Sequence, residues 1–150
     1  MTHAAPPELE GELLLQQRLV GFVRAFGLHR PDETPCGAPV PVSEAHAMSV
    51  LAAHGPLSQT DLARHLALRK STVSRLVDQV VDRGWARRRP SPTDARCRLV
   101  ELTPAGREAA ATLGQVRAER IGRLLARVPA GDRAAVLAAL DTLIEAAREG

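Results

Sequence analysis

A short run of cationic and hydroxyl side chains lies at the centre of the sequence. It comprises Arg69, Lys70, Ser71, Thr72, Ser74 and Arg75. Such groups bind phosphate oxygens and base edges, and an arginine can pair bidentately with guanine. Val73 and Leu76 interrupt the run at helical spacing, which places the polar groups on the opposite face. The pattern indicates a helix whose N-terminal end contacts nucleic acid.

Arg69 occupies a position that helices normally give to another residue type. The pattern places it at or beside the N-cap, where Ser, Thr, Asp or Asn is preferred and a cation opposes the helix dipole. The cost is about 1 kcal/mol by capping measurements, and a phosphate docked at the helix end would offset it. We therefore expect Arg69 to contact DNA.

A second basic cluster follows Gly84. Residues 85–90 and 96–102 alternate with a period of two around the polar turn Ser-Pro-Thr-Asp-Ala, which predicts a β-hairpin. An arginine at the tip of such a wing can enter a narrow minor groove. We expect Asp94 to hold a neighbouring arginine by a salt bridge, with a plain turn residue as the alternative. The candidate wing contacts are Arg87, Arg88, Arg89, Asp94 and Arg96.

Two helices and a tight turn must position the central run. Ser58 and Asp61 stand three apart, as in a capping box, and start a short helix. A turn at 67–69 leads to a longer helix, Lys70 to Arg83, which Gly84 stops. The hydroxyls of Ser58 and Thr60, at the start of the first helix, complete the candidate DNA contacts.

This helix, turn and helix would pack as a helix-turn-helix. We expect small residues, Ala63 and Ala67, where the two helices cross, and branched apolar residues, Val73 and Leu76, anchoring the second helix. The second helix of that motif lies in the major groove with its N-terminal end against the bases.

Further helices flank this segment. The first runs from about Glu8 to Leu28, and a proline-rich linker, Arg30 to Pro41, follows. We expect Ser43 to cap the next helix, which ends near His54. Thr103-Pro104 supplies an N-cap and a first-turn proline for a long helix to about Arg127. After a break at 129–131, the last helix carries an apolar stripe from Val136 to Ile144.

Composition and charge support this organisation. The 150 residues are 45% apolar and 25% charged, as in globular proteins, and only 2% aromatic, so the core must be aliphatic. Residues 64–98 hold ten basic and three acidic side chains, a net charge of +7, whereas the whole chain carries +3. A basic middle within a remainder of −4 is typical of a polyanion site on a separate scaffold.

Residues 57–106, LSQTDLARHLALRKSTVSRLVDQVVDRGWARRRPSPTDARCRLVELTPAG, resemble the MarR family of bacterial winged-helix regulators. The most specific motifs are STVSRLVDQV, then SPTDAR followed by LVELTPAG. The resemblance implies a mainly α-helical fold with a small β-hairpin wing, divided into an N-terminal dimerisation helix and linker (1–42), a winged helix-turn-helix lobe (43–103) and C-terminal dimerisation helices (104–150).

The resemblance also implies a homodimer that binds double-stranded DNA at a pseudo-palindromic operator. Repression relieved by a small-molecule effector is expected, with the pocket between the first helix, the helix from Ser43 and the long helix after Thr103. The sequence departs from the family pattern at Ala95, where the wing commonly has arginine, and at Arg69-Lys70, where Ser-Pro is common.

Other function classes find less support. No glycine loop, GxSxG motif or catalytic triad indicates an enzyme. The histidines show no metal-ligand spacing, and Cys36 and Cys97 cannot build a four-cysteine zinc site, so no metal and no cofactor are expected. A metal- or thiol-operated sensor of the same fold, or a winged-helix protein–protein adaptor, remain alternatives. With no signal pattern and no long apolar run, we expect a bacterial cytoplasmic protein, nucleoid-associated when bound to DNA and without a membrane partner.

Overall fold

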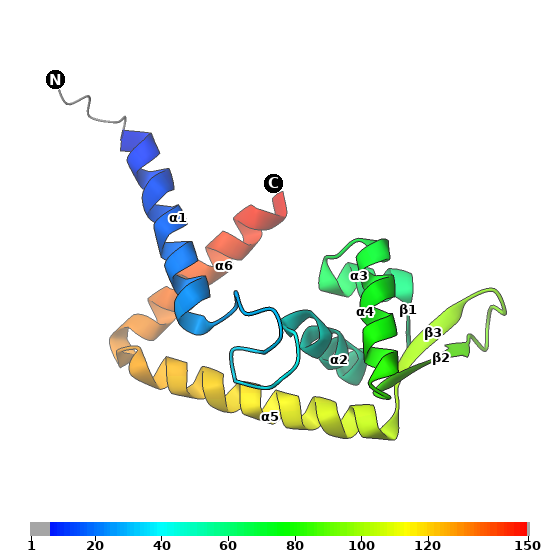
Figure 1. Ribbon diagram of the computed structural model, residues 1–150. Coiled ribbons are helices and arrows are strands. Elements are labelled where there is room, and N and C mark those ends of the chain that lie inside the picture. The colour runs from blue at the N-terminus through cyan, green and yellow to red at the C-terminus, as the bar shows by residue number, and fades with distance from the viewer. Residues whose placement is uncertain (1–6, 150) are drawn as a thin grey trace.

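The computed structural model describes residues 7–149, which fold into a mainly helical chain with a small sheet (Figure 1). The elements before the wing are α1 (Pro7–Phe26), α2 (Val42–His54), β1 (Leu57–Ser58), α3 (Gln59–Leu66) and α4 (Lys70–Asp82). The wing strands β2 (Ala86–Pro90) and β3 (Arg98–Leu102) are followed by α5 (Pro104–Arg127), the 3-10 turn η1 (Ala130–Asp132) and α6 (Arg133–Glu149).

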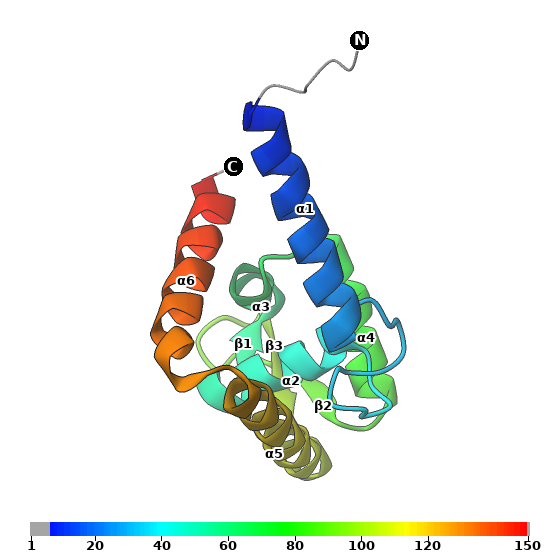
Figure 2. The same ribbon diagram turned by 90° about the vertical axis from the view of Figure 1, so that its left-hand side faces the viewer.

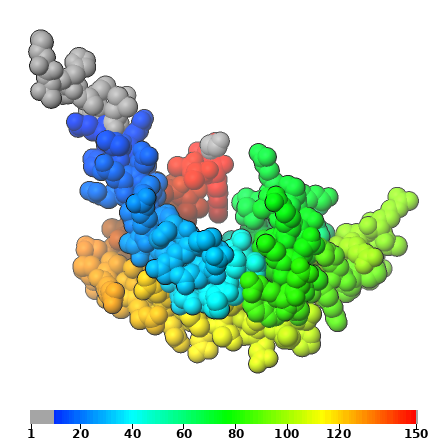
Figure 3. Space-filling view, viewed as in Figure 1, coloured from blue at the N-terminus to red at the C-terminus, as the bar shows by residue number. Residues whose placement is uncertain are grey.

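The long helix α5 connects two parts of the molecule. At one end α2, α3, α4 and the sheet form a packed lobe, and at the other end α1 and α6 stand away from it (Figures 1 and 2). The space-filling view shows α5 running beneath both parts (Figure 3). A helix of 24 residues therefore fixes the distance between the lobe and the outer helices.

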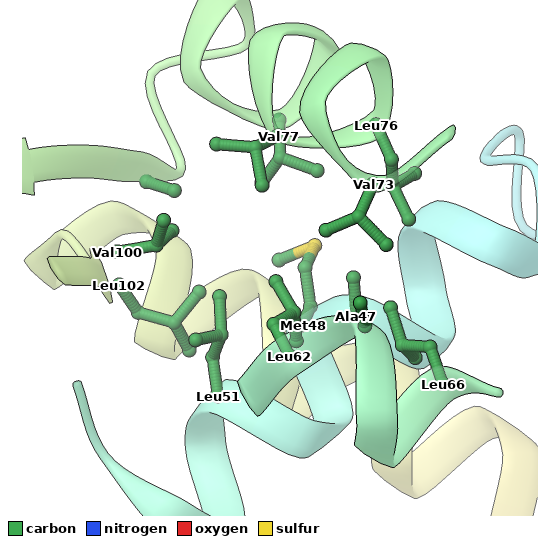
Figure 4. Close-up of a cluster of buried hydrophobic side chains, with 13 residues drawn as sticks. Ala47, Met48, Leu51, Leu62, Leu66, Val73, Leu76, Val77, Val100 and Leu102 are labelled. Atoms are coloured by element: carbon green, nitrogen blue, oxygen red, sulfur yellow. The ribbon is translucent and has the colours of Figure 1, made fainter. Parts of the chain in front are cut away.

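The lobe has an aliphatic core, as the composition predicts. Met48 and Leu62 are completely buried, and Val73, Val77 and Val100 are at most 2% exposed (Figure 4). These residues come from α2, α3, α4 and β3, so one cluster joins the helix-turn-helix to the sheet. The predicted anchors Val73 and Leu76 both lie in this core.

The sheet contains a strand that the sequence pattern does not predict. Its order is β1-β3-β2, and both pairings are antiparallel. The strand β1 has two residues, with Leu57 opposite Val100, and two residues are too few to show a period of two. This pairing fixes the start of α3 to the wing.

Three predicted helix ends differ from the structure. Pro41, and not Ser43, is the N-cap of α2, because the helix begins directly after the proline, whose fixed φ suits an extended cap. The first helix ends at Phe26 because Gly27 has a φ of 94°. Likewise α4 ends at Asp82, before Gly84 with a φ of 77°.

Ala67 does not lie at the crossing of α3 and α4. It is exposed and caps α3 in the left-handed conformation, with a φ of 52°. Its amide donates to carbonyls of the last helical turn, which is how a short helix ends before a tight turn. Of the two alanines, only Ala63 is buried.

The wing meets α5 through a close backbone approach. Thr103 caps α5 as predicted, because its hydroxyl accepts a hydrogen bond from the Gly106 amide at 3.0 Å and donates one to the Gly84 carbonyl at 2.7 Å. A Cβ on Gly106 would lie 1.8 Å from the Trp85 carbonyl oxygen. Glycine at 106 therefore lets the first turn of α5 pack against the backbone between α4 and β2.

The outer helices carry large exposed apolar side chains. The largest exposures are those of Leu13 on α1, at 55%, and Leu137 on α6, at 54%. The other exposed apolar residues are Leu14, Leu15, Leu19, Val20, Phe22 and Val23 on α1, Val136, Leu140 and Ile144 on α6, and Ile121 and Leu125 on α5. No helix among the described residues is long and apolar enough to cross a membrane.

Candidate nucleic-acid interface

The N-terminal half of α4 presents the predicted polar run to solvent. Lys70, Ser71, Thr72 and Arg75 are exposed, and Ser74 is half-buried. The opposite face of the helix is held by Val73, which is fully buried. The helix-turn-helix therefore brings all of these side chains to one outward surface, which we call the α4 face.

Arg69 lies at the N-cap of α4, as its pattern predicts. Its backbone is extended, with φ −69° and ψ 146°, and in the described part of the chain its side chain makes no capping hydrogen bond. The first turn of α4 carries no acidic residue. The helix end therefore offers backbone N–H groups and the positive end of the helix dipole to an anion.

The two candidate contacts on α3 differ in their surroundings. Ser58 is the N-cap, since its hydroxyl oxygen accepts from the Asp61 amide at 3.1 Å and the hydroxyl donates to the Asp61 carboxylate at 2.9 Å. The predicted capping residues thus meet, although the second bond joins two side chains and not a side chain and an amide. Thr60 is exposed.

Two wing arginines share one carboxylate. Arg87 and Arg89 bind the two oxygens of Glu101 at 2.8 Å and 2.9 Å, across the β2–β3 ladder. The hydrogen bond from Arg87, with that from Arg89, holds the pKa of Glu101 below its ordinary value, against the partial burial that raises it. Sequence analysis missed Glu101, although the hairpin register places it directly opposite Arg87.

Arg88 points to the other side of the sheet. Its guanidinium pairs with Asp78 on α4, and the side chain is 28% exposed. Neighbouring strand residues face opposite ways, so Arg88 turns inward while Arg87 and Arg89 turn outward. The ion pair connects the wing to α4.

Hydrogen bonds from backbone amides hold the turn at the tip of the wing. The Asp94 carboxylate accepts a hydrogen bond from the Arg96 amide at 2.9 Å, and the Asp94 carbonyl accepts one from the Cys97 amide at 3.0 Å. Among the described residues Asp94 forms no ion pair, so the expected salt bridge is wrong and the alternative of a turn residue holds. Its side chain shapes the loop that carries the exposed Arg96.

The far end of α4 is tied to α2. Glu44, only 3% exposed, forms an ion pair with Arg83, whose guanidinium lies 5.2 Å from the centre of the Trp85 ring. A buried carboxylate needs such a partner, because an unpaired one costs several kcal/mol. Trp85 packs at the junction of helix and wing, as predicted, but nothing in the sequence spacing indicates the pair of Glu44 and Arg83.

A cavity of about 310 Å³ lies beside the first turn of α2. Val42, Ala45 and His46 of α2 line it together with Phe26 and Ile121. Thr34, Cys36, Arg117 and Arg120 supply its polar groups. Within residues 7–149, no cluster of three or more metal-ligating side chains occurs.

The chain is similar to known regulators of transcription. The MarR family model matches residues 38–96. A curated HTH-type transcriptional regulator of Mycobacterium tuberculosis is 27% identical over 107 residues, which cover 71% of this chain and 75% of that protein.

Solved structures share the fold. The PcaV transcriptional regulator of Streptomyces coelicolor, in complex with its natural ligand, is 21% identical with a TM-score of 0.66, and the match covers 98% of this chain and 97% of that one. Streptococcus pneumoniae FabT, in complex with DNA, is 15% identical with a TM-score of 0.66, and the match covers 95% of this chain and 94% of that one. The match extends over α1, α5 and α6 as well as the lobe.

Proposed function

We propose that the chain is a DNA-binding transcriptional regulator of the MarR family of winged helix-turn-helix proteins, and that it acts as a homodimeric repressor released by a small molecule. The family and the curated relative are regulators and not enzymes, in agreement with the absence of catalytic motifs from the sequence. The proposed location is the bacterial cytoplasm, because the chromosomal DNA lies there.

The observation that carries the proposed DNA contacts is the α4 face. Its exposed cations and hydroxyls surround a helix end that is free of acidic residues. We place this end in the major groove, with Arg69 and Lys70 on phosphates and Thr72 and Arg75 toward base edges. Arg96, at the exposed wing tip, would enter the flanking minor groove.

The ion pairs divide the wing arginines by role. Arg88 is held by Asp78 and would orient the wing relative to α4. Arg87 and Arg89 share Glu101, so they carry less free charge toward phosphate than two unpaired arginines. Arg96 therefore becomes the foremost wing contact in this proposal.

The unpartnered outer helices support a dimer. Monomeric proteins rarely expose a large apolar surface, whereas α1 and α6 carry several large apolar side chains that are 36–55% exposed. Helices that pack on little of their own chain gain stability from a partner. A two-fold dimer would present two copies of α4, so its operator is an inverted repeat with half-sites about one helical turn, or 10 base pairs, apart.

The cavity beside α2 suggests how a ligand could release DNA. An apolar chamber with Arg117 and Arg120 in its lining suits a small anion with an apolar body. The α2 turn that lines the cavity also carries Glu44, which pairs with Arg83 at the C-cap of α4. A ligand that displaces this turn would shift α4 and spoil the register of the two half-sites.

Selection from a random-sequence DNA pool tests the DNA proposal. We expect the wild-type protein to enrich one inverted repeat with A·T-rich flanks. The Arg96→Ala variant should enrich the same repeat but lose the preference for A·T-rich flanks. A selected motif without two-fold symmetry would contradict the dimer mechanism, and flank preference retained by the variant would contradict the role of Arg96.

Displacement of the selected DNA tests the effector. We expect aromatic carboxylates to release it more effectively than the matching neutral amides, and Arg120→Ala to abolish this difference. Equal release by both series in the wild-type protein would contradict the anion site.

A further inference from the structure

Two exposed histidines from different helices lie close together on the surface of the lobe. His54 is the last residue of α2 and His65 is the penultimate residue of α3. Their ring centres are 4.2 Å apart and the ring planes are tilted by 31°. The proximity arises only in the fold, because eleven positions separate the two along the sequence, with a helix end and a turn between them.

The backbones that carry the pair are rigidly placed. Met48 and Leu51 of α2 and Leu62 and Ala63 of α3 share the core of the lobe, and none is more than 8% exposed. The two imidazoles are therefore held near each other by packing that does not involve the rings themselves. A ligand that needs both rings would find them already assembled.

We propose that His54 and His65 form a two-histidine site for a divalent transition-metal ion. Imidazole nitrogen is a good ligand for Ni²⁺, Cu²⁺ and Zn²⁺ and a poor one for Mg²⁺ and Ca²⁺. Metal–nitrogen bonds of about 2.0 Å at a right angle would set the two ring centres about 4.5 Å apart. The observed 4.2 Å is close to that separation, and rotation of the two exposed side chains would aim one nitrogen of each ring at a common ion.

The site would be open and would act on the helix-turn-helix. Water would complete the coordination, because the described residues hold no cluster with a third protein ligand. The bound ion would clamp the C-terminal end of α2 to the C-terminal end of α3, next to the turn that leads into α4. Since the ion binds the folded arrangement, it would stabilise the lobe against unfolding.

Calorimetric titration of the full chain with NiCl₂ tests the proposal, since Ni²⁺ leaves the thiols of Cys36 and Cys97 in their reduced state. Every protein compared carries His3→Gln, which removes a histidine outside the described residues. In this background we expect one ion per chain, and about a hundredfold weaker binding with either His54→Gln or His65→Gln, because one ligand of a preassembled pair is lost. His29→Gln, on an exposed histidine that follows α1, is the matched control and should bind as the background does.

Thermal unfolding in the same proteins gives a second readout. NiCl₂ should raise the Tm of the background protein and of His29→Gln, and leave the Tm of both pair variants unchanged, whereas MgCl₂ should raise the Tm of none of them. No saturable Ni²⁺ binding by the background protein, or binding undiminished in either pair variant, would overturn the proposal. Both substitutions are at exposed positions, so the variants are expected to fold.

Discussion

The residues of the α4 face bear on sequence preference and hardly on folding. Thr72 is exposed, so Thr72→Ala should change the free energy of unfolding by less than about 0.5 kcal/mol. If its hydroxyl contacts a base edge, operator binding weakens by about 1–3 kcal/mol. Titration of operator and scrambled duplexes distinguishes the two effects, with Gln79→Ala, exposed further along the same helix, as the control. An unchanged operator preference would remove Thr72 from the base contacts.

Glu101 sets the free charge of the wing. Glu101→Gln should release Arg87 and Arg89, raise the affinity for non-specific DNA and steepen the plot of log K against log salt by about one to two units. Fluorescence anisotropy at several salt concentrations measures the slope, with Glu108→Gln, exposed on α5, as the control. A slope equal to that of the wild-type protein would show that the two arginines stay away from phosphate.

The same carboxylate predicts a pH dependence of stability. Its pKa in the folded chain lies below the ordinary 4.5, so its pairing stabilises the fold above that pH and is lost as the pH falls below it. The wild-type protein should therefore lose more of its free energy of unfolding than Glu101→Gln between neutral pH and about pH 3.5. Urea unfolding at both pH values provides the comparison, and equal losses would contradict the assignment.

At the scale of elements, the sequence predicts the helices, caps and turns that depend on interactions between neighbouring residues. The amphipathic pattern of α4, the Thr103 cap and the hairpin turn are all confirmed, because each depends on residues within a few positions of one another. The strand β1 and the pair of Glu44 and Arg83 depend on segments that meet only after folding. The hydrophobic period of a segment does not indicate which distant segment it contacts, so these long-range contacts cannot be predicted from the sequence pattern.

The junction of α5 with the wing is the element contact most sensitive to one substitution. Gly106→Ala would place a methyl group against the Trp85 carbonyl and should destabilise the chain by about 3 kcal/mol, since backbone on both sides must move. Gly114→Ala, later in the same helix with no atom within 4 Å of the added Cβ, should be stabilising by about 1 kcal/mol. Chemical unfolding of both variants checks the contrast, and equal effects would contradict the close approach.

At the scale of the whole molecule, the outer helices require a partner. Leu137→Glu places a charge on the apolar surface of α6 and should yield an aggregated or unfolded chain. Ala138→Glu, one residue along on the same exposed helix, should leave the assembly unchanged. Light scattering and circular dichroism measure the two outcomes. A well-folded monomer carrying Leu137→Glu would contradict the proposal that these helices need each other to fold.

The central claim is that the chain binds one DNA sequence in preference to others. Fluorescence anisotropy with the DNA upstream of its own gene, titrated against scrambled competitor at several salt concentrations, tests it most directly. We expect binding that resists the competitor by a factor of at least about 1,000 and weakens steeply with salt. Binding that scrambled DNA removes as readily as the labelled fragment itself, for this DNA and for fragments selected from the whole genome, would contradict the account.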